Sequence, residues 1–169
     1  NNLVSYAVIA GGGGGGSGTP GSSWGGGGGG AGGYRETKSP VTPYTASPLC
    51  GHSTPGNRIT VTATAFPITV GGGGTSGPVS ATAAGKGSNS IFSTITSTGG
   101  GGGASGRWTP SVPYPNAATA SQPGGSGGGA TVNYTTQQSG GSGNTPSVTP
   151  SQGNNGGTSG NGSANFGGG

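Results

Sequence analysis

The stretch Ile91–Gly103, IFSTITSTGGGGG, joins a run of β-branched, aromatic and small residues directly to an unbroken block of glycine. The same junction recurs at Leu3–Gly16, LVSYAVIAGGGGGG, and at Ile59–Gly74, ITVTATAFPITVGGGG. A glycine block has no side chains to bury, so it is either a flexible linker or backbone held by main-chain hydrogen bonds. Because flexible linkers do not usually follow strands, the repeated unit of strand and glycine block indicates architecture.

The residues before these glycine blocks predict strands, because β-branched and aromatic residues fit a pleated surface. The predicted strands are Leu3–Ala10, Ile59–Val70 and Ile91–Thr98. In the second, alternation places Ile59 and Val61 on one face, and Pro67 then marks a bulge, a bend or an edge position. In the third, Ile91 and Ile95 share a face.

The glycine blocks are similar in length, which favours packing over tethering: they are Gly11–Gly16, Gly25–Gly30, Gly71–Gly74 and Gly99–Gly103. A glycine run can form a left-handed helix with about three residues per turn, and without Cβ atoms several such helices can pack through N–H···O=C bonds. We therefore predict an all-β fold with polyglycine II helices and little or no α-helix. In this fold, strand–polyglycine units are packed in a homo-oligomer. The alternative is a set of flexible Gly/Ser linkers.

Two kinds of residue are predicted to carry assembly, namely the ends of the glycine blocks and the apolar strand positions. They are Gly11, Gly16, Gly25, Gly30, Gly71, Gly74, Gly99, Gly103, Ile59, Val61, Ile68, Val70, Ile91 and Ile95.

The composition limits the functional classes. The chain has 169 residues, of which 47 are glycine and 13 are proline, while charged residues make up only 4%. With 25% hydrophobic residues it cannot build the core of an ordinary domain of this length, so we expect its order to depend on neighbouring copies. The formal charge of +4 is scattered along the chain, which argues against a nucleic-acid partner. The longest apolar run, Ala7–Ala10, is far too short to span a membrane.

Two regions are predicted. Residues 1–108 hold the strand–glycine units and nearly all the large apolar side chains. Residues 109–169 are rich in Pro, Ser, Thr, Asn and Gly, which is typical of an extended arm, with one weak strand at residues 130–138. No window has the 3.6-residue apolar periodicity of a helix.

Three motifs resemble a known family: GGAGGYR at Gly29–Arg35, ITVGGGG at Ile68–Gly74 and NSIFSTITSTGGGG at Asn89–Gly102. Through them, about the first 105 residues resemble the glycine-rich domains of bacteriophage virion proteins, which include tail-fibre, adhesin and minor tail proteins, especially of marine phages. The resemblance implies a scaffold of β-strands and polyglycine, usually in trimers or other homo-oligomers, that serves virion structure or host attachment.

The residues that carry chemistry are few. His52 and Glu36 are the only histidine and the only acidic residue, and prolines separate them, so we expect no catalytic site and no enzyme. Cys50 and His52 offer two ligands where a structural zinc site needs four, so neither a metal nor a cofactor is predicted. Asn133 and Asn161 fit the N-glycosylation pattern, which matters only in a glycosylating host.

The remaining candidates for contact are aromatic residues that flank the glycine blocks, namely Trp24, Tyr34 and Trp108. Aromatic rings pack well on flat glycine surfaces, so we expect them to cap the bundle. The alternative is that they contact a carbohydrate or a receptor.

Together these features predict a structural, self-associating protein of a virion or the extracellular space. The first hypothesis is a phage tail fibre or related fibre protein with a role in host attachment. A subunit of a non-viral extracellular filament and a carbohydrate- or receptor-binding adhesin tip are the alternatives. The expected partners are other copies of the chain, other virion proteins and host surface glycans.

Overall fold

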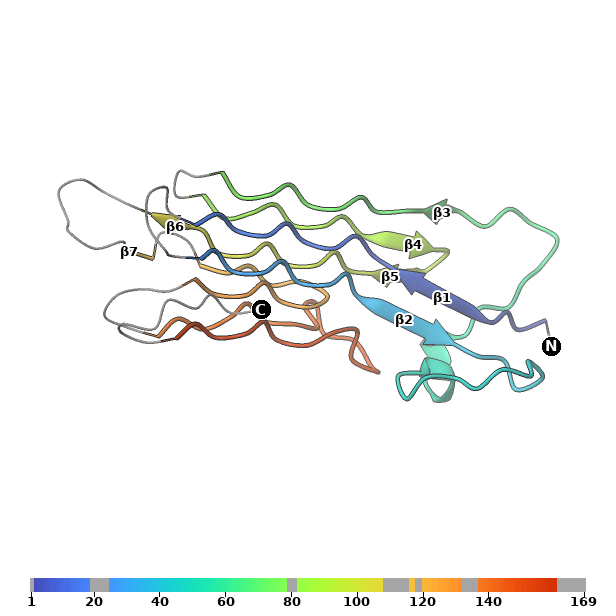
Figure 1. The fold of residues 1–169 in the computed structure, drawn as a ribbon. Coiled ribbons are helices and arrows are strands. Elements are labelled where there is room, and N and C mark those ends of the chain that lie inside the picture. The colour runs from blue at the N-terminus through green and yellow to red at the C-terminus, as the bar shows by residue number, and fades with distance from the viewer. Residues whose placement is uncertain are drawn as a thin grey trace.

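The chain forms an elongated bundle with most of its short strands at one end (Figure 1). In the computed structural model the described residues are 2–18, 25–78, 82–107, 116–117, 120–131 and 137–160. The strands are β1 Tyr6–Ile9, β2 Tyr34–Thr37, β3 Ile68–Thr69, β4 Ser90–Phe92, β5 Ile95–Ser97, β6 Gly106–Arg107 and β7 Asn116–Ala117. Two 3-10 helices, η1 Gly51–Ser53 and η2 Pro55–Asn57, lie between β2 and β3.

The strands pair in small antiparallel sheets, with orders β1-β2, β3-β4-β5 and β6-β7. In the first sheet, Val8 lies opposite Arg35. In the second, Ile91 pairs with both Thr69 of β3 and Thr96 of β5. The helices among the described residues are short 3-10 turns, so the prediction of an all-β fold with little α-helix is confirmed.

The predicted strands are longer than the observed ones. The prediction of one strand over Ile91–Thr98 is wrong, because Ser93 has a φ of 55° and turns the chain into the β4–β5 hairpin. Within Ile59–Val70 only Ile68–Thr69 is a strand, in line with the break expected at Pro67, while Thr60 makes an isolated bridge to Leu3. Leu3–Ala10 contains β1, which is four residues long.

A small apolar core lies where the two larger sheets meet. Val8, Ile59 and Ile95 are buried together. The Phe92 ring packs edge-on against Tyr6, with ring centroids 5.7 Å apart, and the Phe66 centroid lies 6.2 Å from that of Phe92. This cluster joins the sheets at the base of the bundle.

The glycine-rich parts of the described chain form extended segments, numbered I to VIII in chain order. They are residues 10–18, 25–33, 70–78, 82–89, 98–105, 120–131, 137–144 and 151–160. Segments I and III lead away from the strands, and segments II and IV return to them (Figure 1). The sheets therefore hold the entry and exit of both of these glycine excursions at one end.

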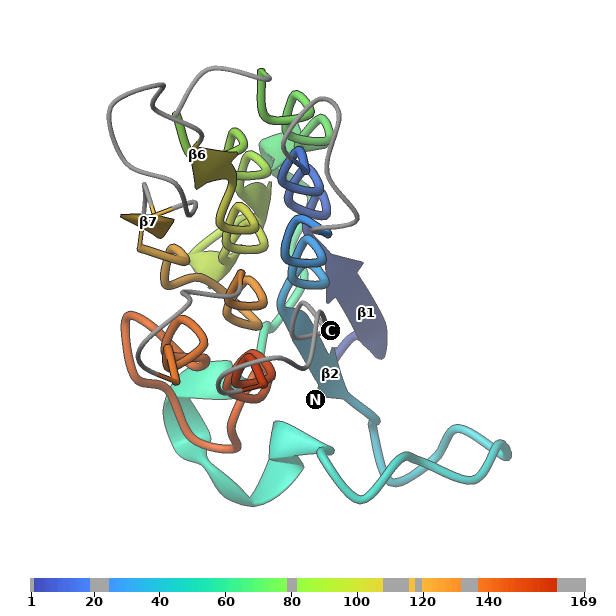
Figure 2. The ribbon, with the colours of Figure 1, turned by 60° about the vertical axis from the view of Figure 1, so that its left-hand side comes forward.

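Backbone hydrogen bonds join these segments and repeat every third residue. In segment I, one set of amides donates to segment II: Ala10 to Gly33, Gly13 to Gly30 and Gly16 to Gly27, at 2.8–3.1 Å. The next set donates to segment IV: Gly11 to Ser88 and Gly14 to Gly85. Viewed nearly end-on, several segments have a triangular outline (Figure 2). A three-residue period differs from both a strand and an α-helix.

Segment V is surrounded by other segments. Gly99 to Ser105 are all buried. Its amides donate to segments I and VI, for example Gly103 to Gly14 at 3.0 Å and Gly101 to Ser126 at 2.9 Å. Its carbonyls accept from segments II and IV in the same three-residue pattern.

The glycines of segment V are required by close backbone approach. A Cβ would lie under 3.0 Å from a carbonyl oxygen of a neighbouring segment at each of them: Gly99 (Gly87), Gly100 (Gly30), Gly101 (Gln122), Gly102 (Ala84) and Gly103 (Gly27). None of these glycines has a φ in the left-handed region, so the requirement comes from packing. Side chains do occur at exposed positions of other segments, such as Ala31, Thr75 and Lys86.

The described part of the predicted C-terminal arm lies against the earlier segments. The Ala104 amide donates to Gly129 of segment VI, and the Gly129 amide donates to Gly28 of segment II at 2.8 Å. The boundary at residue 108 falls outside the described residues, as do residues 132–136 of the predicted strand 130–138. The division into two regions therefore stays a prediction, although hydrogen bonds connect them.

We predict that one added methyl group has opposite effects at two glycines. Gly101→Ala drives a Cβ into the Gln122 carbonyl and should lower the free energy of unfolding by about 3 kcal/mol. Gly56→Ala places its Cβ in open space and should leave that free energy unchanged or raise it by about 0.5 kcal/mol. Differential scanning calorimetry of the two variants measures both effects. Equal melting temperatures would contradict the close packing of segment V.

Candidate functional site

The glycines predicted to carry assembly lie at contacts between segments of the same chain. At all but one of them a Cβ would meet a backbone oxygen of another segment: Gly11, Gly16, Gly30, Gly71, Gly74, Gly99 and Gly103. Gly25 is exposed and has open space around it. Their role between copies of the chain stays a prediction.

The apolar residues predicted for assembly fall into two groups. Ile59 and Ile95 are buried in the core, and Val61 and Ile91 are half-buried. Ile68 and Val70, by contrast, are 71% and 84% exposed. Only this second group presents apolar surface to a partner.

An apolar groove of about 370 Å³ lies at the base of the bundle, between β1 and the pair β3 and β4. Its lining includes the exposed side chains of Ile9, Ile68 and Val70. Contiguous exposed apolar surface of this kind usually marks an interaction site. Ile68 and Val70 were predicted to carry assembly, whereas Ile9 was not, because no faces were assigned within the predicted strand Leu3–Ala10.

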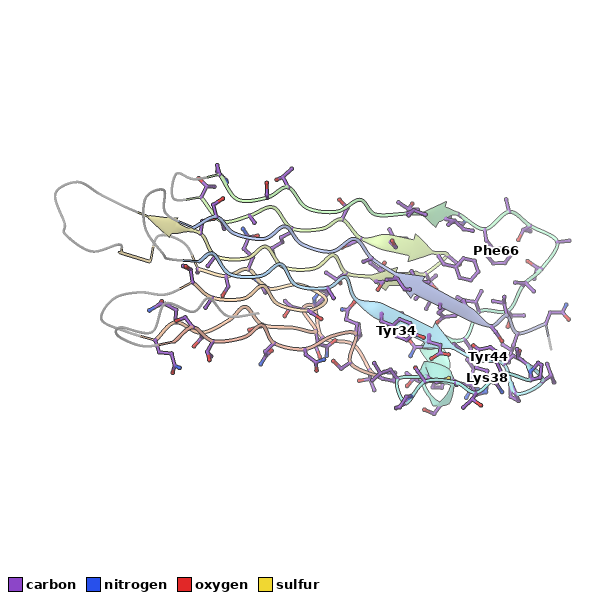
Figure 3. All side chains as sticks on the ribbon, viewed as in Figure 1. Tyr34, Lys38, Tyr44 and Phe66 are labelled. Carbon is purple, nitrogen blue, oxygen red and sulfur yellow. The ribbon has the colours of Figure 1, made fainter. Side chains whose placement is uncertain are left out.

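Trp24 and Trp108 lie outside the described residues, as do Asn133 and Asn161. Tyr34 is half-buried in β2, and its amide donates to Gln152 at 2.9 Å. Figure 3 shows Tyr34, Tyr44 and Lys38 at the same end of the molecule. The Lys38 ammonium lies 5.8 Å from the centroid of the Tyr44 ring, within the range of a cation–π contact.

These residues belong to a loop cluster, residues 34–58, which extends from the base of the bundle. It holds Arg35, Glu36, Lys38 and Arg58, and the only cysteine and histidine of the chain. Exposed apolar side chains project from it: Val41 is 90% exposed, and Tyr44 and Leu49 are partly exposed.

Asn57 organises the buried side of the loop cluster. Its Oδ1 accepts a hydrogen bond from Arg35 Nη2 at 2.5 Å, and its Nδ2 donates to the Thr149 carbonyl at 2.9 Å. Its own carbonyl accepts from the Tyr6 and Thr37 hydroxyls. The buried Arg35 is thus paired with the Asn57 side-chain amide. Asn57 also connects the loop cluster to β1, through Tyr6, and to Thr149, which lies just before segment VIII.

The fold brings Cys50 beside Glu36 through an isolated parallel bridge, which the sequence did not indicate. Cys50 Sγ accepts a hydrogen bond from the Lys38 amide at 3.3 Å. His52 follows in η1, and its Nδ1 is buried without a hydrogen-bond partner. Within the described residues, no three His, Cys, Asp or Glu side chains are grouped so that they could hold a metal ion. The prediction that the chain is not an enzyme remains untested by this arrangement.

Glu36 is buried, and its carboxylate accepts hydrogen bonds from the Ser47 amide, at 3.0 Å, and from the Ser47 hydroxyl. Burial raises the pKa of Glu36, but the Ser47 bonds, with further ones from Tyr34 and Tyr44, outweigh it. The pKa of this carboxyl therefore lies below its usual range. The folded loop cluster favours the charged form of Glu36.

We predict that this carboxylate accounts for most of the acid sensitivity of the fold. Because its pKa is lower in the folded chain, Glu36 stabilises fully above the unfolded value near 4.5, and this contribution is lost as the pH falls through the folded value. Glu36 is the only acidic side chain, so Glu36→Gln should remove most of the drop in melting temperature between about pH 6 and about pH 3. Ser47→Ala removes the hydroxyl hydrogen bond that lowers the pKa of Glu36 in the folded chain, so it should make that drop smaller. An unchanged acid profile in Glu36→Gln would refute the assignment.

None of the helices among the described residues has the length and apolar character needed to cross a bilayer. A search of curated proteins and a search of solved structures each gave no match. A family model described as a glycine-rich domain matches residues 1–169. The chain therefore belongs to the glycine-rich domain family.

Proposed function

We propose that this chain is a structural, self-associating virion component, a phage tail fibre or a related fibre protein, whose shaft is a bundle of polyglycine II helices. The observation that carries the proposal is the three-residue hydrogen-bond repeat among the segments, of which I, II, III and V are mostly glycine. In a polyglycine II helix the amides point outward in three directions, one for each residue of the turn. Segment I follows this scheme, with successive amides donating to segments II and IV.

A bundle of this kind suits a mechanical role. At about 3.1 Å per residue, residues 10–18 would extend roughly 28 Å along the shaft. Neighbouring segments are joined by main-chain bonds along this length, so bending the shaft would stretch many hydrogen bonds together. The sheets and the loop cluster lie at one end (Figure 1). This arrangement is a rod of glycine segments with most of its side chains at one end, which favours a fibre component over a catalyst.

Membership of the glycine-rich domain family supports the structural part of the proposal. The viral part rests on the resemblance of Gly29–Arg35, Ile68–Gly74 and Asn89–Gly102 to glycine-rich virion proteins. In such a protein the glycine bundle would be the scaffold, and other virion proteins would be its neighbours.

Electron microscopy of the native material, with gold-labelled antibodies against the chain, tests this function. We predict discrete particles, or short tapered fibres of fixed length, with the label on the fibre. Long uniform filaments with a single helical repeat would refute the tail-fibre proposal and favour a non-viral extracellular filament, since heterologous contacts that do not close give open polymers.

A second candidate function, contact with a host surface, is favoured by the exposed side chains of the loop cluster. Val41, Tyr44 and Leu49 are exposed in the loop cluster at the base of the bundle, and Lys38 lies against the Tyr44 ring. Exposed aromatic and cationic side chains are typical anchors in recognition. The loop cluster could therefore bind a glycan or a protein receptor while the bundle holds it away from the particle.

We predict that Tyr44→Ala weakens binding of the purified chain to host cells by about tenfold or more, because it removes an exposed anchor. Thr75→Ala, which changes an exposed side chain on the shaft, should bind like the wild type. Binding is measured by flow cytometry with labelled protein. Equal binding by both variants would exclude Tyr44 from the contact.

A further inference from the structure

Segments III, I and II form one layer of the bundle. The Gly74 amide of segment III donates to Gly12 of segment I at 2.8 Å, and Gly13 of segment I donates to Gly30 of segment II at 2.8 Å. Figure 2 shows the three segments one below another on the same side of the molecule. β1 runs directly into segment I, and β3 runs directly into segment III. The outer side of this layer with β1 and β3 is called the bare face below.

Segment I and the first part of segment III present exposed glycines on the bare face at positions where the bundle does not need them, while Ala31 of segment II and Thr75 and Ser76 of segment III are exposed with side chains. A Cβ would lie 3.7 Å from the nearest carbonyl oxygen at Gly12 and 3.9 Å at Gly15, which are ordinary contacts. At Gly73 the separation is 3.7 Å, and at Gly72 nothing lies within 4 Å. None of these four glycines has a φ in the left-handed region. Neither packing inside the chain nor backbone conformation therefore explains why they are glycine.

Glycine at such positions destabilises a fold, since alanine would reduce the freedom of the unfolded chain. Inside the bundle, side-chain-free positions are those where another glycine-rich segment approaches closely, as at Gly101. The four exposed glycines of the bare face also lack a side chain, but no segment of this chain approaches them closely. A further glycine-rich segment from outside the chain would supply this approach.

The bare face also has hydrogen-bond donors to offer. Among the described residues, the amides of Gly12 and Gly15 donate to no carbonyl, whereas those of Gly13 and Gly14 between them do. Gly12 and Gly15 are both exposed. These two amides are three residues apart, as the amides that bond to each neighbouring segment are. A further segment placed outside the bare face would therefore meet amides with the same spacing as in the interior.

Apolar side chains extend this surface at the base. Ile9 is 61% exposed where β1 enters segment I, and Ile68 and Val70 are exposed beside segment III. They line the groove of about 370 Å³ described above. The groove and the exposed glycines are therefore adjacent along the chain, because β1 and β3 line the groove and lead directly into segments I and III.

The charge distribution identifies the partner. Segments I, II and III, β1 and β3 contain no charged residue, although the chain has a formal charge of +4. An acidic partner would find no cation here, whereas two identical faces can meet without repulsion between like charges. A second copy also brings the side-chain-free backbone that the interior contacts require.

We propose that the bare face pairs with the bare face of a second copy of this chain, through backbone hydrogen bonds between glycine segments and through burial of Ile9, Ile68 and Val70. This inference rests on the self-association of the proposed function and assigns the surface for it. A face that pairs with itself gives a two-fold dimer, because the same patch is used on both copies.

Sedimentation equilibrium of the full chain, up to roughly 100 μM, tests the proposal with two matched pairs of variants. Ile68→Glu places a charge on the bare face, and Val41→Glu places the same charge on an equally apolar exposed position of the loop cluster. The double variant Gly12→Ala with Gly15→Ala adds methyl groups to the bare face, and Gly56→Ala adds one in open space away from it. Melting temperatures within a few degrees of the wild type show that each variant is folded.

We expect the wild type to dimerise and both bare-face variants to raise its dissociation constant by about tenfold or more, while Val41→Glu and Gly56→Ala dimerise like the wild type. Association that is equally strong in the bare-face variants would overturn the assigned surface and leave self-association standing. A wild type that stays monomeric would overturn both the surface and the self-association. Loss of association in Val41→Glu alone would place the contact in the loop cluster and refute the bare face.

Discussion

The close approach of backbone to backbone in segment V is the constraint on which the rest of the structure depends. Each glycine from Gly99 to Gly103 faces a carbonyl oxygen of a neighbouring segment at a distance that excludes a Cβ. Such contacts hold the bundle together without side chains. They do not fix how far one segment is shifted along its neighbour, because one glycine is like the next. A slip by one three-residue turn would restore the same hydrogen bonds. The parts of the molecule with side chains must therefore fix the alignment.

The base of the bundle fixes it. β1 and β2 align segments I and II through their register, and the β4–β5 hairpin aligns segments IV and V. Gln152, which is buried, accepts a hydrogen bond from the Thr98 amide at the start of segment V and donates to the Pro146 carbonyl. The few side chains of the core and of the loop cluster thus specify the geometry that the glycines then propagate along the shaft.

The sequence predicted the class of fold because the junctions of strand and glycine are local patterns. It failed at Ile91–Thr98, where period-two alternation continues through Ser93 although the chain turns there. It also assigned the ordering of glycine to neighbouring copies. Hydrogen bonds from Gly127 and Ala130 to segment VIII show partners within the same chain, which composition alone could not distinguish from an extended arm. The bridge between Glu36 and Cys50 depends on tertiary contact, so no spacing indicated it.

A lattice of glycine segments could in principle add rows on every side, as an open sheet edge adds strands. On segment IV Lys86 is exposed, and on segment VIII Asn154 is exposed. These side chains occupy the space in which another backbone would have to lie, and Lys86 adds a charge. In segment I, by contrast, the exposed positions are Gly12 and Gly15 alone. If growth is possible only there, pairing through the bare face consumes the surface and assembly stops at two copies, so a longer fibre would need contacts at the ends of the shaft.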